Sequence, residues 1–166
     1  MPNYTMTAEE ARQLFSYNPE TGDLAWRVRK KGVKVGRPTR PNAKIAYHRV
    51  CVEGQIYLAH RVAWLITYGC WPEGNIDHIN GNPGDNRIVN LRECTQSQNM
   101  RNTSLSSRNT SGKKGVTWAK RERKWVAYIR YGGKKHRIGG FDTLDEAYAA
   151  YCRAAFEHHG EFANVG

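Results

Sequence analysis

Asn80–Arg87, with the sequence NGNPGDNR, cannot continue a helix or a strand. Its asparagine, aspartate, glycine and proline residues favour turns and interrupt regular structure, so a loop is predicted here. Short strands are predicted on either side, at Asn75–Ile79 and Ile88–Cys94. The next segment, Thr95–Arg101, begins a helix with Thr95 as the expected N-cap. The centre of the chain is therefore predicted to fold as strand, loop, strand and helix.

Polar residues of this central unit form a candidate hydrolytic site. Asp77 and His78 are adjacent, and Asn90 and Asn99 follow on the second strand and the helix. Hydrolysis of a phosphodiester needs a base that activates water and a cation that offsets negative charge. His78 can act as the base, while Asp77 and Asn99 offer oxygen ligands to one hard divalent ion. Asn90 is expected to orient the imidazole, although Asn86 competes for this role and an asparagine before leucine often closes a loop.

Basic residues flank this centre on both sides. The whole chain carries 26 lysines and arginines against 15 aspartates and glutamates, a formal charge of +11. Residues 1–58 carry ten basic and five acidic side chains, residues 59–103 four of each, and residues 104–166 twelve and six. Such a charge favours a polyanionic partner. The neutral centre suits a bound cation, which more lysines and arginines would repel, while the two flanks suit DNA phosphates.

Several other classes of protein are not expected. The four cysteines are scattered without a Cys-x-x-Cys pair, so no zinc site is predicted and the thiols are expected to be reduced. The first residues lack the apolar run of a signal peptide, and no stretch approaches the length of a membrane span. A soluble, cytoplasmic protein without a membrane partner is therefore expected.

Local patterns predict further elements before the central unit. They are a helix after the capping box of Thr7 and Glu10, a turn at Asn18–Asp23, a strand at Leu24–Arg29, a hairpin of Ala46–Val52 with Gln55–Leu58, and a helix at Ala59–Tyr68. The stretch 32–41 is rich in glycine, proline and basic residues and is predicted to be a mobile loop. Its basic side chains can either contact phosphate or simply face solvent, and both alternatives are kept. His60 and Arg61, at the start of the last helix, are assigned structural roles.

The last third of the chain has a different pattern. Residues 104–111 are rich in serine and threonine and are predicted to be a linker. Three strands are predicted at Gly115–Ala119, Trp125–Tyr131 and Lys135–Ile138, followed by a helix that begins at Thr143 and stops at Gly160. Strand alternation directs one face of this sheet toward the helix. The opposite face is expected to present Lys124, Val126, Tyr128, Arg130, Lys135 and Arg137.

Several motifs of the central unit occur together in a known family. They are His60-Arg61-Val62-Ala63-Trp64, Ile76-Asp77-His78-Ile79-Asn80-Gly81, Asn86-Arg87, Asn90-Leu91-Arg92 and Gln98-Asn99. Over about residues 54–102, with the earlier segment LFSYNPETGDLAWRVR, the chain resembles the HNH homing endonucleases of bacteriophages. This resemblance implies a ββα-metal finger in which His78 is the general base, Asp77 and Asn99 bind the metal, and Asn90 orients the base. Asn99 stands where other members have a second histidine.

The same resemblance implies the cofactor and the partner. One divalent metal ion, Mg²⁺ or alternatively Mn²⁺, and double-stranded DNA are expected. A monomer with a single finger would cut one strand per encounter, so a dimer is left open for double-strand cleavage. A phage-encoded enzyme of this kind would act in the cytoplasm of the host bacterium.

A second resemblance covers about residues 111–165. The motifs Gly112-x-x-Gly115-Val116, Trp125-x-Ala127-x-Ile129 and Gly139-x-Phe141-Asp142-Thr143 are similar to those of the ethylene-response-factor type of DNA-binding domain, in the APETALA family. Such domains insert a three-stranded sheet into the major groove of DNA. This implies DNA contacts for Lys124, Tyr128, Arg130, Lys135 and Arg137. Arginine can pair with guanine, whereas lysine is better suited to phosphate.

Together these patterns predict an α+β protein in four parts. A β-rich region at 1–53, with possible DNA contacts, precedes an HNH nuclease domain at 54–103, the linker at 104–111, and a DNA-binding domain at 112–166 with a three-stranded antiparallel sheet packed on one helix. The predicted function is metal-dependent hydrolysis of DNA phosphodiester bonds. A DNA-binding regulator with an inert finger is the main alternative. An RNA-binding protein is less favoured, because the sheet lacks paired stacking aromatics.

Overall fold

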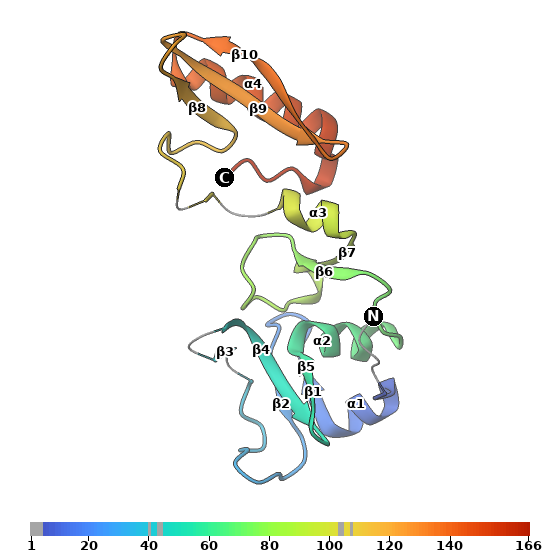
Figure 1. Cartoon of the computed structure of the whole chain (residues 1–166). Coiled ribbons are helices and arrows are strands. Elements are labelled where there is room, and N and C mark those ends of the chain that lie inside the picture. The colour runs from blue at the N-terminus through green and yellow to red at the C-terminus, as the bar shows by residue number, and fades with distance from the viewer. Residues whose placement is uncertain (1–4, 40, 43–44, 103–104, 107) are drawn as a thin grey trace. The chain divides into compact units, whose positions relative to one another are not determined.

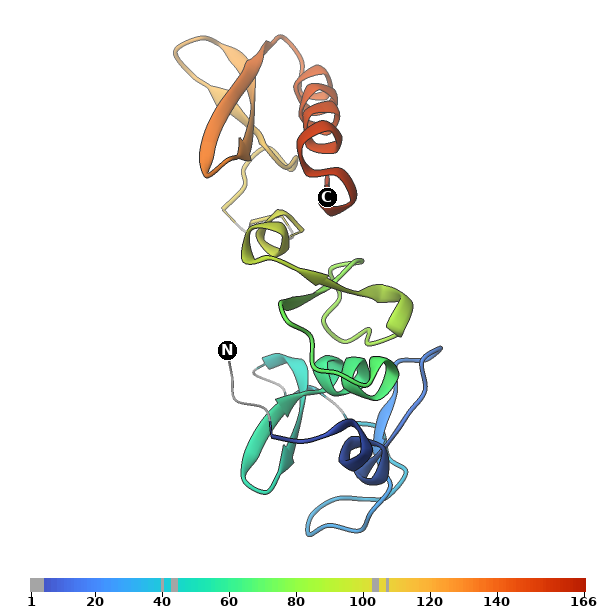
Figure 2. The ribbon, with the colours of Figure 1, turned by 90° about the vertical axis from the view of Figure 1, so that its right-hand side faces the viewer.

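The computed structural model describes residues 5–39, 41–42, 45–102, 105–106 and 108–166 (Figures 1 and 2). Helices and antiparallel sheets both occur along the chain, so the predicted α+β class is confirmed. The chain divides into two compact units, Met1–Gln96 and Ser97–Gly166. This division differs from the predicted one, because residues 1–53 belong to the same unit as the central hairpin and the helix after the hairpin crosses the boundary.

The N-terminal unit is built from short helices and strands. Its elements are α1 (Ala8–Leu14), β1 (Phe15–Tyr17), β2 (Leu24–Trp26), β3 (Pro41–Asn42), β4 (Ile45–Val52), β5 (Gln55–Leu58), α2 (Ala59–Tyr68), β6 (Asn75–His78), the 3₁₀ turn η1 (Ile88–Asn90) and β7 (Leu91–Cys94). The sheets are β1–β2, β3–β4–β5 and β6–β7. Thr7 and Glu10 form the predicted capping box of α1, and β4 turns into β5 at Glu53 and Gly54.

β2 is shorter than predicted, and the backbone that follows folds back onto it. The Gly36 N–H donates to the Trp26 carbonyl at 2.9 Å, and the Thr39 N–H donates to the Leu24 carbonyl at 2.7 Å. Residues 32–39, which were expected to be mobile, are therefore tied to the sheet by backbone hydrogen bonds. The remainder of the predicted loop includes residue 40, which lies outside the described residues.

A hydrophobic core joins the first strands to α2. Its members include Met6, Ala11, Phe15, Leu24, Trp26, Val50, Tyr57, Val62 and Leu65. α1 lies beside α2 in both views of the ribbon (Figures 1 and 2). α2 ends where it is predicted to end, at Gly69, whose φ of 79° lies in the left-handed region. Because residues 1–53 share this core with α2, they do not form a domain of their own.

The central hairpin pairs β6 with β7 and packs on α2. Ile76 and Leu91 join Ala63 of α2 in a second, smaller core. The antiparallel register places Asp77 directly opposite Arg92. The first residues of the predicted second strand form the turn η1 instead, and pairing with β6 begins only after it. The loop between the two strands occupies the predicted position.

The C-terminal unit is a three-stranded antiparallel sheet packed on one helix, as predicted. Its elements are α3 (Gln96–Arg101, which begins at the last residue of the N-terminal unit), β8 (Val116–Ala119), β9 (Lys124–Tyr131), β10 (Lys134–Phe141), α4 (Leu144–His159) and the 3₁₀ turn η2 (Gly160–Phe162). The strand order is β10–β9–β8, and α4 covers one face of the sheet. Thr143 and Glu146 form the predicted capping box of α4. No helix among the described residues has the length and apolar character needed to cross a membrane.

Val126 of β9 is more buried than its position predicts. Strand alternation directs it away from α4, yet its exposed fraction is 0%. It pairs with Gly140 of β10, and the side chains of Lys124 and Arg137 lie 3.5 and 3.2 Å from the place that a Cβ of this glycine would occupy. Long basic side chains therefore cover apolar surface on this face of the sheet.

Candidate active site

Asp77 lies on β6 and is held by an arginine of the neighbouring strand. Its side chain is only 5% exposed, and Arg92 donates to its Oδ2 atom from Nε at 3.0 Å and from Nη2 at 2.8 Å. The positive charge of Arg92 offsets the free-energy cost of burying the Asp77 carboxylate. This role of Arg92 was not predicted. Its position on the second strand was predicted, but only the register of the hairpin shows that it faces Asp77.

His78 ends β6, and its imidazole is held by Asn86. The side chain is 5% exposed, and its Nε2 atom lies 3.1 Å from Oδ1 of Asn86, which is itself buried. An amide oxygen only accepts hydrogen bonds, so the imidazole donates from Nε2 and carries its lone pair on Nδ1. Asn86, which was predicted to compete with Asn90 for this role, is thus the asparagine in contact with the imidazole.

Asn90 holds the loop between β6 and β7. Its side-chain oxygen accepts from the Asn80 backbone N–H at 3.0 Å, and its amide donates to the Asn80 side chain at 3.1 Å and to the Asp85 carbonyl at 2.8 Å. This matches the alternative role considered for Asn90, that of a loop-closing asparagine. Its predicted hydrogen bond to the imidazole is replaced by these contacts, so any effect on His78 passes through the loop.

Charged side chains order the same loop from its outer side. Arg87 donates to both carboxylate oxygens of Asp85, at 2.8 and 2.7 Å, and Asn80 donates to Asp85 at 2.7 Å. The hydrogen bond from Arg87 lowers the pKa of the Asp85 carboxyl to about 2. The loop therefore keeps this ion pair at neutral pH and holds a defined shape around His78.

His60 and Arg61, at the start of α2, are buried and make structural contacts, as predicted. Arg61 donates to the carbonyls of Pro72 and Gly74 at 3.0 and 2.9 Å, which fixes the turn before β6. His60 is 4% exposed, and its buried Nδ1 atom has no hydrogen-bond partner among the described residues. Its ring lies edge-on to that of His78, with 5.1 Å between the centroids. Burial, together with the nearby His78, lowers the pKa of His60 to about 3. His60 is therefore neutral at physiological pH.

Asn99 lies on α3, in the C-terminal unit, whereas Asp77 belongs to the N-terminal unit. Their joint metal site stays a prediction. A carboxylate has two oxygens and several lone pairs, so Asp77 can serve Arg92 and a cation together. Over the described ranges, no group of three or more His, Cys, Asp or Glu side chains is placed to hold a metal. An aspartate carboxylate and an asparagine carboxamide each offer an oxygen of the kind that a hard cation binds, together with water and phosphate oxygens.

The predicted DNA-contacting residues lie on the face of the C-terminal sheet opposite α4. Lys135 pairs with Arg130 and Arg137 pairs with Tyr128 across β10 and β9. The Lys135 ammonium lies 3.7 Å from the centroid of the Tyr128 ring. Ion pairs offset part of the charge, since Arg137 binds Glu122 and Lys124 lies 3.3 Å from Asp142.

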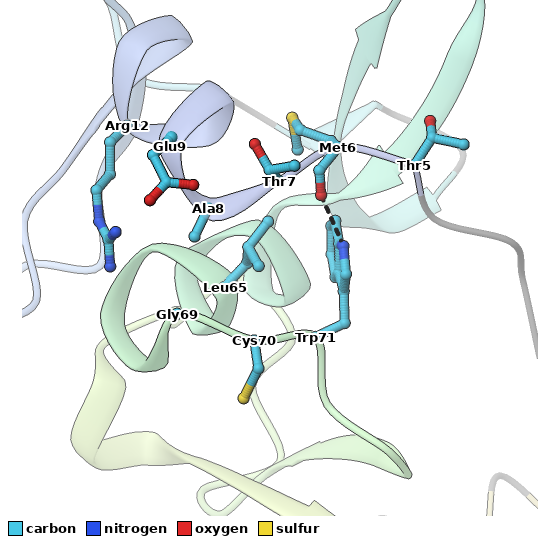
Figure 3. A pocket seen from close by; sticks show the side chains of 10 residues that line it. All are labelled: Thr5, Met6, Thr7, Ala8, Glu9, Arg12, Leu65, Gly69, Cys70 and Trp71. Atoms are coloured by element: carbon cyan, nitrogen blue, oxygen red, sulfur yellow. Dashed lines mark hydrogen bonds between the residues drawn. The ribbon is translucent and has the colours of Figure 1, made fainter.

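A shallow cavity lies elsewhere in the N-terminal unit, between the start of α1 and the end of α2 (Figure 3). It has a volume of about 470 Å³ and contains none of the predicted site residues. Trp71 forms one wall, and its indole N–H donates to the Met6 carbonyl at 2.9 Å. The polar site around His78 is therefore separate from this cavity.

A family model and two relatives match this chain. Residues 57–101 match the family model of HNH endonucleases. Protein 3.8 of Escherichia phage T7 is 37% identical over 105 residues, which cover 63% of this chain and 86% of that protein. An uncharacterized HNH endonuclease of Acanthamoeba polyphaga mimivirus, L560, is 35% identical over 111 residues, which cover 66% of this chain and 57% of that protein. The match to the HNH endonuclease model defines a DNA nuclease. The chain belongs to the HNH endonuclease family, whose members typically use a divalent metal ion.

A solved structure described as DNA binding and cleavage by the HNH homing endonuclease I-HmuI is a more distant match. It aligns with 87% of this chain and 84% of its own chain, at 20% identity and a TM-score of 0.37. A likeness at that level carries no argument about the site. None of these matches names a domain of the ethylene-response-factor type, so that resemblance stays a prediction.

Proposed function

We propose that this endonuclease hydrolyses phosphodiester bonds of double-stranded DNA with His78 as its general base and Mg²⁺ as its metal ion. The observation that carries this proposal is the imidazole of His78, which is buried beside Asp77 and held at Nε2 by Asn86. A general base needs a fixed orientation, and the hydrogen bond to Asn86 supports this role for the imidazole, with Nδ1 as the proposed proton acceptor. Mn²⁺ is the alternative ion, since it accepts a similar set of oxygen ligands.

The proposed reaction is the hydrolysis of one phosphodiester bond, with His78 as the base. As a water oxygen attacks phosphorus, its proton passes to Nδ1 of His78, and the bond between phosphorus and the 3′ oxygen breaks. The 3′ oxygen takes a proton from solvent, which leaves a 5′ phosphate and a 3′ hydroxyl. A divalent cation bound with Asp77, and with Asn99 as the proposed second protein ligand, would offset the charge on the phosphate and the leaving oxygen. Asn90 and Asn86 keep the loop and the imidazole in place.

A nicking assay on supercoiled plasmid, with and without Mg²⁺, tests this function. His78→Ala should lower the cleavage rate by about 10²–10⁴ while the affinity for DNA stays unchanged, because a general base contributes to the rate and not to phosphate binding. His158→Ala, which removes an exposed histidine of α4, is the matched control. Absence of nicking by the native protein would favour the alternative, a DNA-binding regulator with an inert finger.

We also propose that the C-terminal sheet selects the DNA site. The supporting observation is that Arg130, Lys135 and Arg137 lie together on the sheet face that α4 leaves uncovered. Arg130→Ala should lose about 1–3 kcal/mol of affinity and relax the sequence preference at particular positions. Lys135→Ala should weaken all sequences alike and make the salt dependence less steep. Unchanged cut sites for both variants on one long DNA would contradict this role.

Two further parts of the proposal concern assembly and place of action. A monomer with one finger would cut one strand per encounter, so double-strand breaks would need a dimer or a second encounter. The likeness to protein 3.8 of phage T7 supports action in the cytoplasm of a host bacterium. Sedimentation of the protein on a single nicked duplex would distinguish a monomer from a dimer.

A further inference from the structure

The turn after β1 packs directly on the loop that carries Asn86. The Tyr17 hydroxyl donates to the backbone carbonyl of Asn86 at 2.7 Å, across 69 positions of sequence. The Ile88 N–H donates to the carbonyl of Pro19 at 3.2 Å. Tyr17 at the end of β1 and Pro19 in the following turn thus contact the two ends of the segment Asn86–Ile88. Asn86, at one end of this segment, holds the imidazole of His78.

Gly22 brings the same turn closer than any other residue could. A Cβ at this position would lie 2.5 Å from the Arg87 nitrogen and 2.7 Å from the carbonyl carbon of Asn86. These atoms are backbone and cannot move aside without moving the loop. The φ of Gly22 is +77°, which also favours glycine. The contact is therefore one of backbone against backbone.

The turn is stiff enough to act as a support. The Asn18 N–H donates to the Asp23 carbonyl at 2.9 Å, and the Gly22 N–H donates to the Asn18 carbonyl at 2.8 Å. The Asn18 side chain accepts from the Glu20 N–H at 2.9 Å, which closes a local turn. Burial, followed by the nearby Tyr68 and Asp85, raises the pKa of Tyr17 to about 12. Its hydroxyl therefore remains a donor throughout the working pH range.

We infer that Tyr17 and Gly22 are positioning residues of the active site, which act through Asn86 on the orientation and tautomer of His78. The N-terminal segment thereby supports the catalytic base from a distance, in addition to any contact with DNA. The consequence for cleavage rests on the proposed role of His78, whereas the effect on the imidazole itself does not. The inference can therefore be tested on the metal-free protein.

Nitrogen-15 NMR of the histidine side chains in the full-length, metal-free protein, above pH 7.5, reports the tautomer of His78. The native protein should show the Nε2–H form, and Gly22→Ala should show a mixture of both forms. Gly69→Ala is the matched control, because Gly69 also has a positive φ of 79°, but within the described part of the chain only its own sequence neighbours lie within 4 Å of the missing Cβ. A Gly22→Ala spectrum like that of Gly69→Ala would overturn the inference.

Tyr17→Phe keeps the test decisive if Gly22→Ala does not fold, because it removes one hydroxyl and no packing. It should shift the His78 tautomer and lower kcat about threefold to tenfold at unchanged KM, the effect of one neutral hydrogen bond. Gly22→Ala should lower kcat by about a hundredfold, since a displacement on the order of 1 Å can cost that much. Tyr57→Phe removes another buried hydroxyl of the same unit, one that contacts Gln55, and should change neither value.

The two proposals fail in different ways. A tautomer shift in Tyr17→Phe, together with native cleavage in His78→Ala, would support the positioning contact and refute the catalytic role of His78. An unchanged tautomer in Tyr17→Phe and Gly22→Ala would refute the positioning role, whatever the protein cleaves.

Discussion

Acidification should destabilise the N-terminal unit through His60. The pKa of this buried imidazole is about 3, against 6.5 for an ordinary histidine, because burial and then His78, Arg61 and His48 disfavour its charged form. As the pH falls below 6.5, the unfolded chain binds a proton at His60 that the folded protein does not bind. The contribution of His60 to the free energy of unfolding is therefore fully present above pH 6.5 and decreases as the pH falls toward 3.

The magnitude follows from the width of this interval. Each pH unit below 6.5 shifts the balance by about 1.4 kcal/mol, so about 2 kcal/mol should be lost at pH 5.0 relative to pH 7.5. His60→Phe keeps an aromatic ring in the site and removes the titrating group. The variant should lose about 2 kcal/mol less than the native protein over the same interval, although its stability at pH 7.5 can differ in either direction.

Urea unfolding followed by methyl NMR measures this effect within the full chain. Val62 and Leu65 lie on α2 in the core beside His60, so their signals report the N-terminal unit. Val116 lies in the core of the C-terminal unit and should show the same pH dependence in both proteins. An equal loss of N-terminal stability in the native protein and the variant would refute the reasoning. A group other than His60 would then account for the proton that binds on unfolding.

Three further outcomes are expected. Asp77→Ala or Asn99→Ala should raise the Mg²⁺ concentration needed for half-maximal nicking, and an unchanged titration would contradict the ligand assignment. Arg92→Met should lower the free energy of unfolding by about 3–5 kcal/mol in urea denaturation, because it leaves the buried Asp77 carboxylate without its guanidinium; a loss below about 1 kcal/mol would argue against that pairing. Gly115→Ala should destabilise the C-terminal unit by about 1–3 kcal/mol or more in thermal unfolding, because its Cβ would lie 2.1 Å from a ring carbon of Tyr151; a native melting temperature would contradict this packing.

Elements with local signals could be predicted from the amino-acid sequence. Both capping boxes, the end of α2 at Gly69 and the loop Asn80–Arg87 depend on residues within a few positions of one another, so composition and spacing were sufficient to predict them. The adjacent Asp77 and His78 and the motifs around them likewise indicated the nuclease family before any contact was known. Helix caps, helix ends and turns depend on neighbouring residues, so they can be predicted from one stretch of sequence.

The contacts between distant residues follow from the three-dimensional fold. Asn86 contacts the imidazole, although Asn90 was the favoured candidate, because the path of the loop places Asn86 there. Arg92, which was not a candidate, faces Asp77 because of the hairpin register. The contact of Tyr17 with Asn86 joins residues 69 positions apart. No local pattern specifies such a pair, because it forms only after the shared core brings the two segments together.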